Sequence, residues 1–487
     1  MKENIKKMLF SLILTGVFLL TSIVFVCIIT SSGFLTGELL TFFSIVLLLF
    51  AGLVFLLSKD TKRKVRSVMA AILAAVIIVV EVLGSYFVLV GHDALKFITE
   101  PDTEHAEVGV YVRKDDAAET INDVKGYTFG RLSVQDKEIT DFAFENISIE
   151  IGDIENIKEY ENLGKLMDAL LTSKEVDVVV VNEGMMDLLD EIEGHSKDEK
   201  NIRKIYKVVI NTDIVPTTPA PSTPKDEKNE NVFTVYISGI DSSGSVSVRS
   251  RSDVNILATV NIETGQILLV STPRDYFVPL SISNGALDKL THAGIYGVEV
   301  SKDTMEMIYD TEIDYYFKVN FDGFKEIIDA LGGITVNSQF NFGNGIYNFV
   351  KGKNHLDGKA ALSFARNRMS FANGDAQRGK HQMEVIRAVI EKATSPAIIT
   401  NFKSVLDGVK GAFETNMPYE KITELIQNQL KNGTKWNVTS YSVYGTGGSD
   451  IPYSLGYYAY VLVPNRESVI KAEALMEQVK DGEVPTP

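Results

Sequence analysis

The chain contains 487 residues, with 64 acidic and 48 basic side chains and a formal charge of −16. At roughly 100–200 residues per domain, this length predicts a few domains. The acidic balance argues against general nucleic-acid binding, which requires a basic surface, so DNA is not an expected partner. The six histidines lack metal-ligand spacing, and the lone cysteine, Cys27, excludes a disulfide framework.

Three apolar runs open the chain, at Met8–Thr30, Leu35–Leu57 and Val68–Val90. Each is long enough to provide the roughly 20 residues that cross a bilayer. We therefore predict a membrane region over residues 1–91 with three transmembrane helices. The second and third runs argue against a cleaved signal peptide. Glu81 lies within the third run, and the sequence assigns it no role.

Basic residues predict the orientation of these helices. The loop 31–34 between the first two runs has none, whereas the opposite flanks carry Lys2, Lys6, Lys7, Lys59, Lys62, Arg63, Lys64 and Arg66. Because positively charged flanks stay in the cytoplasm, we expect a cytoplasmic N-terminus and extracellular domains after residue 91.

Residues 92–215 are predicted to form an accessory α/β domain. We expect strands at Val108–Val112, Val176–Val181 and Tyr206–Asn211, and a helix at Leu163–Leu171. This part shows no catalytic constellation, and we interpret its acids, including Glu191, as members of solvated faces. The proline-rich and then charged segment 216–230 predicts an extended linker.

A second exterior domain is predicted over residues 231–480, followed by a short tail over 481–487. Its apolar patterns alternate between strands and helices, which favours a mixed β-sheet flanked by α-helices. The expected strands are Phe233–Ser238, Asp253–Val260, Gln266–Ser271 and Tyr315–Val319, and the expected helices are Asp303–Tyr309, Asp322–Leu331 and Thr423–Leu430. The glycine-rich stretch Gly445–Ser449 is expected to be a flexible loop. Nearby tyrosines suit either a sugar-stacking surface or ordinary packing, and packing is favoured: Tyr441, Tyr444, Tyr453, Tyr457, Tyr458 and Tyr460.

One stretch of this domain gathers cations around a predicted helix start. Asp375 stands where a helix N-cap is expected, and Arg378 and Gln382 begin the inward face of that helix. Guanidinium groups at a helix N-terminus favour a phosphate-rich anion, and Arg366 and Arg368 lie just upstream. The alternative is a surface helix whose arginines pair with nearby glutamates.

Two aspartates suggest a metal site close to these cations. Asp241 and Asp253 flank the short loop Ser242–Ser247, so their carboxylates can meet. Mg²⁺ takes one or two carboxylates and completes its shell with water and phosphate oxygens, which suits a Mg²⁺-pyrophosphate complex. Alternatively, each aspartate is an ordinary turn or strand-edge residue.

Ordered motifs from Asn231 to about Lys392 resemble the catalytic domain of the LytR-CpsA-Psr family. The matching stretches are Gly239-Ile240-Asp241-Ser242, Arg251-Ser252-Asp253, Thr272-Pro273-Arg274-Asp275, Asp288-Lys289-Leu290-Thr291-His292-Ala293, Lys318-Val319-Asn320-Phe321, Asp329–Gly333, His355–Gly358, Ala361–Arg368 and Gly374-Asp375 with Arg378 and Gln382. The three-span start and the accessory domain resemble the streptococcal capsule-type branch of this family. His381 departs from the pattern, because many relatives have an arginine there, and we leave it out of the site.

The resemblance implies a Mg²⁺-dependent phosphotransferase on the surface of a Gram-positive bacterium. Such enzymes move a glycopolymer, for instance capsular polysaccharide, from undecaprenyl-pyrophosphate to peptidoglycan. By motif, Asp241 and Asp253 would hold Mg²⁺, and the pyrophosphate would be bound by Arg251, Arg274, Arg366, Arg368, Arg378 and Gln382. Arg274 would also serve catalysis, with Asp375 as the general base and Asp275 as the alternative. Membrane lipid and other capsule-assembly proteins are further candidate partners.

Two other functions stay open on the sequence. A transcriptional or signalling regulator of capsule synthesis would need DNA contact from short cytoplasmic segments that cannot hold a helix-turn-helix. A polyprenyl pyrophosphatase would use the same site with water as the acceptor, so the residues do not separate it from a transferase.

Overall fold

The computed structural model describes residues 2–59, 64–99, 104–211, 229–242, 244–368, 370–371, 374–395, 404–405, 408 and 411–487. The chain divides into two compact units. One contains the helices α1, α2, α3 and α13, and the other contains both α/β domains.

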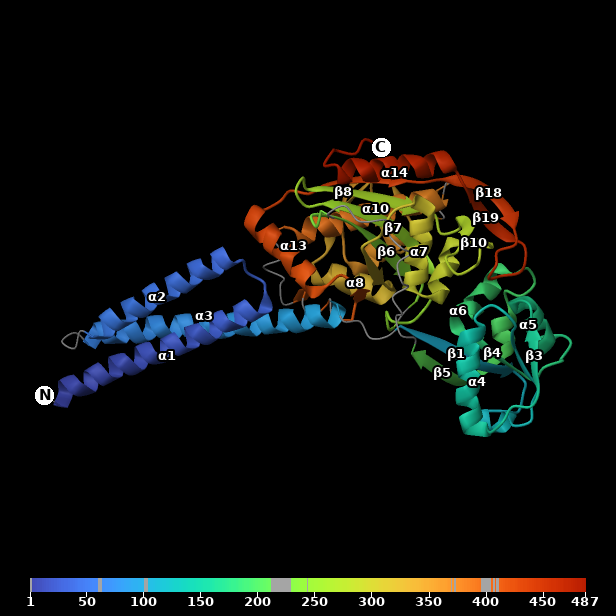
Figure 1. Cartoon of the computed structure of the whole chain (residues 1–487), viewed down its shortest axis with the longest axis horizontal. Coiled ribbons are helices and arrows are strands. Elements are labelled where there is room, and N and C mark those ends of the chain that lie inside the picture. Colours follow the sequence, from blue (N-terminus) through green and yellow to red (C-terminus); the bar gives the residue numbers. More distant parts are fainter. Residues whose placement is uncertain are drawn as a thin grey trace. The chain divides into compact units, whose positions relative to one another are not determined.

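The first unit is built from long apolar helices. α1 (Lys2–Ser32), α2 (Gly37–Lys59) and α3 (Lys64–Thr99) pack against one another (Figure 1). All three are long and apolar enough to cross a membrane, so the apolar helices expected from the sequence are confirmed. Glu81 is buried and accepts a hydrogen bond from Ser22, which ties α3 to α1.

A helix from the far end of the sequence belongs to the same unit. α13 (Tyr419–Asn432) contains the predicted helix Thr423–Leu430 and extends it at both ends. The Tyr419 hydroxyl donates to the Ser32 carbonyl at 2.6 Å, and Lys431 pairs with Glu38 of α2 at 3.3 Å.

The accessory part is a five-stranded sheet with a helix on each face. The strand order is β3-β2-β4-β1-β5, and β4 (Val178–Asn182) is buried along its whole length, as its valine run predicts. Its side chains alternate between α4 (Lys137–Ile151) and α5 (Leu163–Leu171). The other elements are β1 (His105–Arg113), η1 (Ile121–Val124), β2 (Phe129–Leu132), β3 (Ile157–Tyr160), α6 (Glu183–Met186), η2 (Asp187–Glu191), η3 (Asp198–Asn201) and β5 (Ile202–Asn211).

The larger sheet has six strands in the order β16-β11-β6-β7-β8-β17. The central strands β6, β7 and β8 are antiparallel, whereas β11 pairs with β6 and β17 pairs with β8 in parallel. The predicted mixed sheet is therefore confirmed. Its strands are β6 (Val232–Ile240), β7 (Ser252–Asn261), β8 (Gln266–Thr272), β11 (Tyr315–Val319), β16 (Phe413–Thr415) and β17 (Asn437–Ser442).

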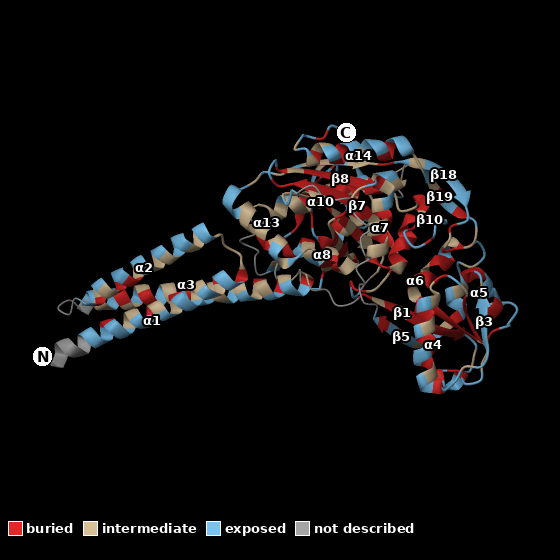
Figure 2. Cartoon of the chain, in the orientation of Figure 1, coloured by how far each residue is buried: buried red, intermediate tan, exposed pale blue. Residues whose placement is uncertain are grey.

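Helices cover both faces of this sheet, as the alternation of its side chains requires. Tyr236 and Leu257 point to one face, where they pack with α7 (Val298–Tyr309) and α14 (Arg466–Lys480). Their neighbours Ile237 and Val254 point to the opposite face, toward α8 (Phe321–Ala330), α9 (Gly358–Arg366) and α10 (Gly374–Ala393). Figure 2 shows the sheet as a largely buried layer, whereas the helices on its two faces mix buried, intermediate and exposed residues.

Short paired strands and one 3₁₀ segment complete this domain. The pairs are β9 (Phe277–Pro279) with β10 (Leu287–Lys289), β12 (Ile334–Ser338) with β15 (Gly352–Leu356), β13 (Phe342–Gly343) with β14 (Asn348–Phe349), and β18 (Gly445–Asp450) with β19 (Ala459–Pro464). η4 covers Leu290–Tyr296.

One element differs from the prediction. Gly445–Ser449, expected as a flexible loop, lies in strand β18, because β19 supplies a continuous pairing partner that overrides the low strand propensity of glycine. Most of the predicted linker 216–230 lies outside the described residues. The structure describes only its last two residues, 229 and 230.

Candidate active site

A cavity of about 730 Å³ lies between the larger sheet and the helices α8, α9 and α10. One part of its wall is apolar, formed by residues such as Ile237, Val254, Phe324, Leu362 and Ile386. The remaining wall is strongly charged. Its charged residues are Asp190, Glu191, Asp241, Arg251, Asp253, Arg274, Asp275, Lys289, Arg366, Arg368, Asp375 and Arg378.

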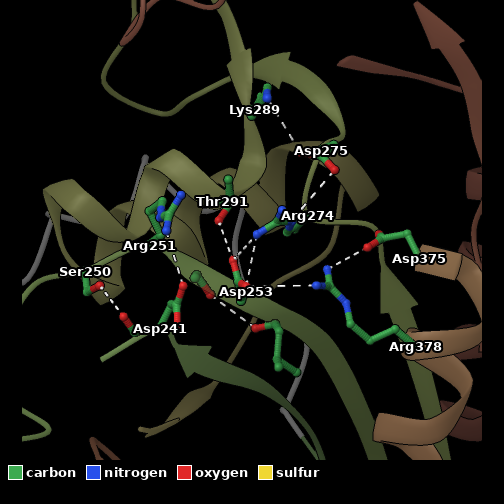
Figure 3. A network of polar contacts seen from close by, with 12 residues as sticks. Asp241, Ser250, Arg251, Asp253, Arg274, Asp275, Lys289, Thr291, Asp375 and Arg378 are labelled. Atoms are coloured by element: carbon green, nitrogen blue, oxygen red, sulfur yellow. Dashed lines mark hydrogen bonds and ion pairs between the residues drawn. The ribbon is translucent and has the colours of Figure 1, made fainter. Parts of the chain in front are cut away.

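Asp253 lies at the centre of the charged wall, next to two arginines (Figure 3). Arg274 Nη1 lies 2.9 and 3.0 Å from its two carboxylate oxygens, and Arg378 Nη1 lies 4.0 Å away. Thr291 adds a weaker hydrogen bond at 3.3 Å. Burial alone would raise the pKa of Asp253, but these guanidinium groups outweigh it and lower that pKa. Asp253 is therefore held as an anion that orients both arginines.

Arg251 links a second aspartate to the accessory domain. Its Nη2 donates to Asp241 and its Nη1 donates to Glu191, both at 3.2 Å. A bulge between β6 and β7 places Asp241 opposite Arg251, where the Asp241 amide donates to the Arg251 carbonyl. Local sheet geometry thus brings Asp241 and Asp253 to one edge of the cavity, as the sequence predicted.

Glu191 also contacts two further cations. Lys289 Nζ lies 2.5 Å from Glu191 Oε2 and 3.7 Å from Asp275 Oδ1, and His292 Nε2 lies 4.0 Å from Glu191 Oε2. The other ring nitrogen of His292 is 2.6 Å from Asp288. Burial would lower the pKa of His292, but the two carboxylates raise it to about 9, so the ring is an imidazolium. Burial would raise the pKa of Glu191, yet His292 and Lys289 hold it far below its usual range.

The remaining predicted residues line the same cavity. Arg366 and Arg368 are exposed, and Arg366 stacks over the Phe321 ring at 4.2 Å. Gln382 follows Arg378 by one helical turn and also faces the cavity. The geometry therefore brings together every residue that was predicted for phosphate, metal and base.

Asp375 differs from its predicted place by a small shift. It lies in the first turn of α10, which begins at Gly374, rather than at the N-cap. From there it forms an ion pair with Arg378 at 2.7 Å. Its negative charge in the first turn also interacts favourably with the positive end of the helix dipole.

A match to a known family model assigns the domain that contains this cavity to a protein family. The model of the LytR_cpsA_psr family matches residues 186–474, which is more than half of the chain and includes every predicted site residue. The chain belongs to this family. The resemblance found in the motifs is thereby confirmed.

Relatives within the LytR_cpsA_psr family are named for a transferase activity. A polyisoprenyl-teichoic acid–peptidoglycan teichoic acid transferase TagU of Bacillus licheniformis is 36% identical over 225 residues, covering 44% of this chain and 72% of the relative. The transferase of the same name from Bacillus subtilis is 35% identical over 216 residues, covering 44% and 69%. The crystal structure of B. subtilis TagV covers 53% of this chain and 100% of its own at 26% identity, with a TM-score of 0.44.

The donor set of this LytR_cpsA_psr site fits a magnesium ion that is shared with phosphate. No group of three or more histidine, cysteine, aspartate or glutamate side chains that could hold a metal occurs among the described residues. A protein cage is therefore absent from that part of the chain. Mg²⁺, however, needs one or two carboxylates when phosphate oxygens and water complete its shell, and Asp241 and Asp253 supply carboxylates in the cavity wall.

The place of Glu191 in the cavity wall was not predicted from the sequence. The residue was interpreted as part of a solvated face, but its side chain is only 17% exposed and contacts Arg251 and Lys289. Lys289 belongs to a family motif but was assigned no role, and Tyr460 was predicted to take part in packing, although both residues line the cavity. Local patterns did not reveal Glu191, because its partners lie 60 and 98 residues further along the chain. His381, left out of the site, packs among Phe342, Phe364 and Phe371.

Proposed function

We propose that this protein is a membrane-anchored phosphotransferase. It moves a glycopolymer, with its linking phosphate, from an undecaprenyl-pyrophosphate carrier to peptidoglycan. The supporting observation is a single cavity with a cation-rich wall and an apolar wall. A lipid pyrophosphate matches both, because its pyrophosphate is anionic and its lipid chain is apolar. Its relatives are named for polyisoprenyl-teichoic acid as donor and peptidoglycan as acceptor. Capsular polysaccharide or a related anionic glycopolymer is the proposed cargo.

Unused donors in the cavity support an anionic ligand. The Nε groups of Arg251 and Arg274 are buried and donate no hydrogen bond to any described residue. A buried guanidinium N–H without an acceptor is costly, and because both arginines line the cavity, an oxygen-rich ligand bound there would offset part of the cost of burying these charges. We assign the pyrophosphate to Arg251, Arg274 and Arg378, with the exposed Arg366 and Arg368 and the Gln382 amide completing the shell.

The chemistry is an in-line displacement at phosphorus. An acceptor hydroxyl oxygen forms a bond to the glycopolymer-bearing phosphorus, while the bond from that phosphorus to the bridging oxygen breaks. Undecaprenyl phosphate leaves, and the hydroxyl proton passes to a carboxylate. The arginines neutralise charge on the non-bridging oxygens in the transition state. Mg²⁺, held by Asp241 and Asp253, would supply further charge neutralisation when bound.

Asp375 is the proposed base and Asp275 the alternative. Asp375 is 35% exposed, so an acceptor hydroxyl can reach its carboxylate, which lies 2.7 Å from Arg378. Burial raises the pKa of Asp275 against the opposing effects of Arg274 and Lys289, which keeps it protonated to higher pH. We propose the orientation expected from the basic flanks, with the N-terminus in the cytoplasm and both α/β domains outside.

The test compares two arginines of one helix in the purified full-length protein. Arg378 lines the cavity, whereas Arg387 pairs with Glu384 and Glu391 outside it. With undecaprenyl-pyrophosphate-linked glycan, Mg²⁺ and peptidoglycan oligomers, Arg378→Ala should lower glycan transfer by about 10³-fold or more, and Arg387→Ala should retain it. Release of lipid phosphate without glycan on the acceptor would assign a pyrophosphatase instead. No turnover by wild type would favour the regulatory alternative.

A further inference from the structure

The β18–β19 hairpin presents two exposed aromatic rings beside the cavity. Tyr460 on β19 lines the cavity wall and is nevertheless 56% exposed, and Tyr458, two residues earlier, is 70% exposed. Five of the six residues of β18, the strand paired with β19, are exposed, and Figure 2 shows β18 in pale blue. Ordinary packing therefore does not explain these two tyrosines.

Strand β19 runs directly beside the segment that carries the candidate catalytic groups. The Leu462 amide donates to the Asp275 carbonyl at 2.8 Å, and Tyr276 forms an isolated β-bridge with Leu462. Partial burial raises the pKa of Tyr460, and the nearby carboxylates of Asp275 and Asp375 raise it further. The Tyr460 ring thus lies at the point where the cavity, both candidate bases and the solvent meet.

The hairpin that carries Tyr460 is itself almost uncharged and leaves room for the ring. A Cβ at Gly447 would lie 3.1 Å from the Tyr460 ring, so glycine leaves room for the ring to lie flat against β18. Between residues 445 and 464 the sequence contains a single charged residue, Asp450. The hairpin therefore offers no cations to a phosphate or an anionic membrane, unlike the cavity next to it.

We propose that this hairpin binds the acceptor: a sugar ring of the peptidoglycan glycan strand stacks on Tyr460, and Tyr458 extends the platform to a neighbouring sugar. A flat aromatic ring with a polar tip suits a pyranose, which has an apolar face of C–H groups and hydroxyls at its edge. A strand seated there directs a hydroxyl toward the phosphorus between Asp275 and Asp375. This assignment rests on the proposed function and names its acceptor subsite.

The accessory domain supports this platform. Tyr457 packs so closely on α5 that a Cβ at Gly164 would lie 2.6 Å from its ring. Leu455 and Ala459 belong to the same buried cluster as Leu163 and Leu166 of the accessory domain. The segment that carries Tyr458 and Tyr460 is thus anchored on the accessory domain through Leu455, Tyr457 and Ala459.

Steady-state transfer by the full-length protein in detergent tests the assignment. The substrates are undecaprenyl-pyrophosphate-linked glycan and uncross-linked peptidoglycan oligomers, each varied in turn. Tyr460→Ala should raise KM for the oligomers about tenfold, the loss expected when an aromatic stacking contact is removed. KM for the lipid-linked donor should change less than about twofold. Tyr458→Ala should raise the oligomer KM about threefold, and Tyr460→Phe, which keeps the ring, should stay near wild type.

Tyr444→Ala is the matched control. Tyr444 is 54% exposed and adjoins β18 but does not line the cavity, so its variant should keep wild-type values for both substrates. Equal oligomer KM values for Tyr460→Ala and Tyr444→Ala would overturn the subsite, as would an equally large rise in donor KM. In both cases transfer by wild type would leave the proposed function standing. Wild type that transfers no glycan would defeat that function and the subsite together.

Discussion

At the scale of single residues, carboxylates hold the cations of the cavity in place before any substrate arrives. Asp253 contacts Arg274 and Arg378, and Glu191 contacts Arg251 and Lys289. Each carboxylate lowers the cost of burying several like charges close together. The site is therefore preorganised for an anion, at the expense of some of its net positive charge.

Glu191→Gln should destabilise the protein, because the amide keeps the shape of the carboxylate but removes its charge. The loss of ionic contacts to Lys289 and Arg251 should cost about 2–3 kcal/mol at neutral pH. Thermal unfolding of the full-length protein in detergent measures this. Glu193→Gln is the control, since Glu193 is exposed two residues further on. Equal melting temperatures for the two variants would show that Glu191 does not stabilise the fold.

The pH dependence of this difference follows from the direction of two pKa shifts. The pKa of Glu191 is lowered in the folded state, so its contribution is present above about pH 4.5 and is lost on acidification. The pKa of His292 is raised from 6.5 to about 9, so its contribution is complete below pH 6.5 and is lost as the pH rises through 9. The difference between wild type and Glu191→Gln should therefore be largest near pH 5–6 and smaller at pH 10.

Sequence reasoning found the residues of the site that stand in clustered motifs. Arg251, Asp253 and Arg274 occur at the ends of predicted strands, where side chains of neighbouring strands meet. The contacts of Glu191 were not predicted, because its partners Arg251 and Lys289 belong to the other α/β domain. No periodicity within its own segment distinguishes it from the solvated acid Glu193.

At the scale of elements, the strands and helices followed from apolar periodicity. β11 and α5 have the predicted bounds, β7 is one residue longer than predicted at each end, and β8 is one residue longer at its C-terminal end. β18 was mistaken for a loop, because its stability comes from pairing with β19 rather than from its own glycine-rich sequence. Similarly, the pattern placed α10 correctly but not the exact start of its first turn.

The contact between α10 and β8 provides a test at this scale. A Cβ at Gly379 would lie 2.7 Å from Ser271 Oγ, so Gly379→Ala should push the start of α10 away from the sheet and displace Arg378. Glycan transfer should fall about tenfold or more, since small misplacements of binding groups are costly. The double variant Gly379→Ala/Ser271→Ala removes the clashing oxygen and should recover most of the activity. A double variant as impaired as Gly379→Ala would show that this close packing does not position Arg378.

At the scale of the whole molecule, the chain joins an apolar helical unit to a unit that holds both α/β domains. α13 belongs to the helical unit although its neighbours in sequence, β16 and β17, belong to the larger sheet. The apolar helices long enough to cross a membrane were predictable, because length and apolarity suffice to recognise such helices. The partnership of α13 with α1 and α2 was not predictable, since it depends on long-range contacts such as that of Tyr419 with the Ser32 carbonyl.

The accessory domain also acquires a role only in the complete molecule. It contributes Glu191 to the cavity wall and supports the segment that carries Tyr460. Residues 92–215 show no catalytic constellation in their sequence. They nevertheless contribute to the cavity through the surface that packs against the larger domain.

In the proposed reaction the linking phosphate is transferred together with the glycopolymer, and the fate of the phosphorus atom tests this most directly. The donor would carry a ³²P label in the phosphate bonded to the sugar and would be incubated with full-length protein, Mg²⁺ and peptidoglycan oligomers. We expect the label in the peptidoglycan fraction, with unlabelled undecaprenyl phosphate released in equal amount. Label that stays with the lipid, or that appears as free glycan phosphate while the acceptor stays unlabelled, would contradict phosphotransfer to peptidoglycan.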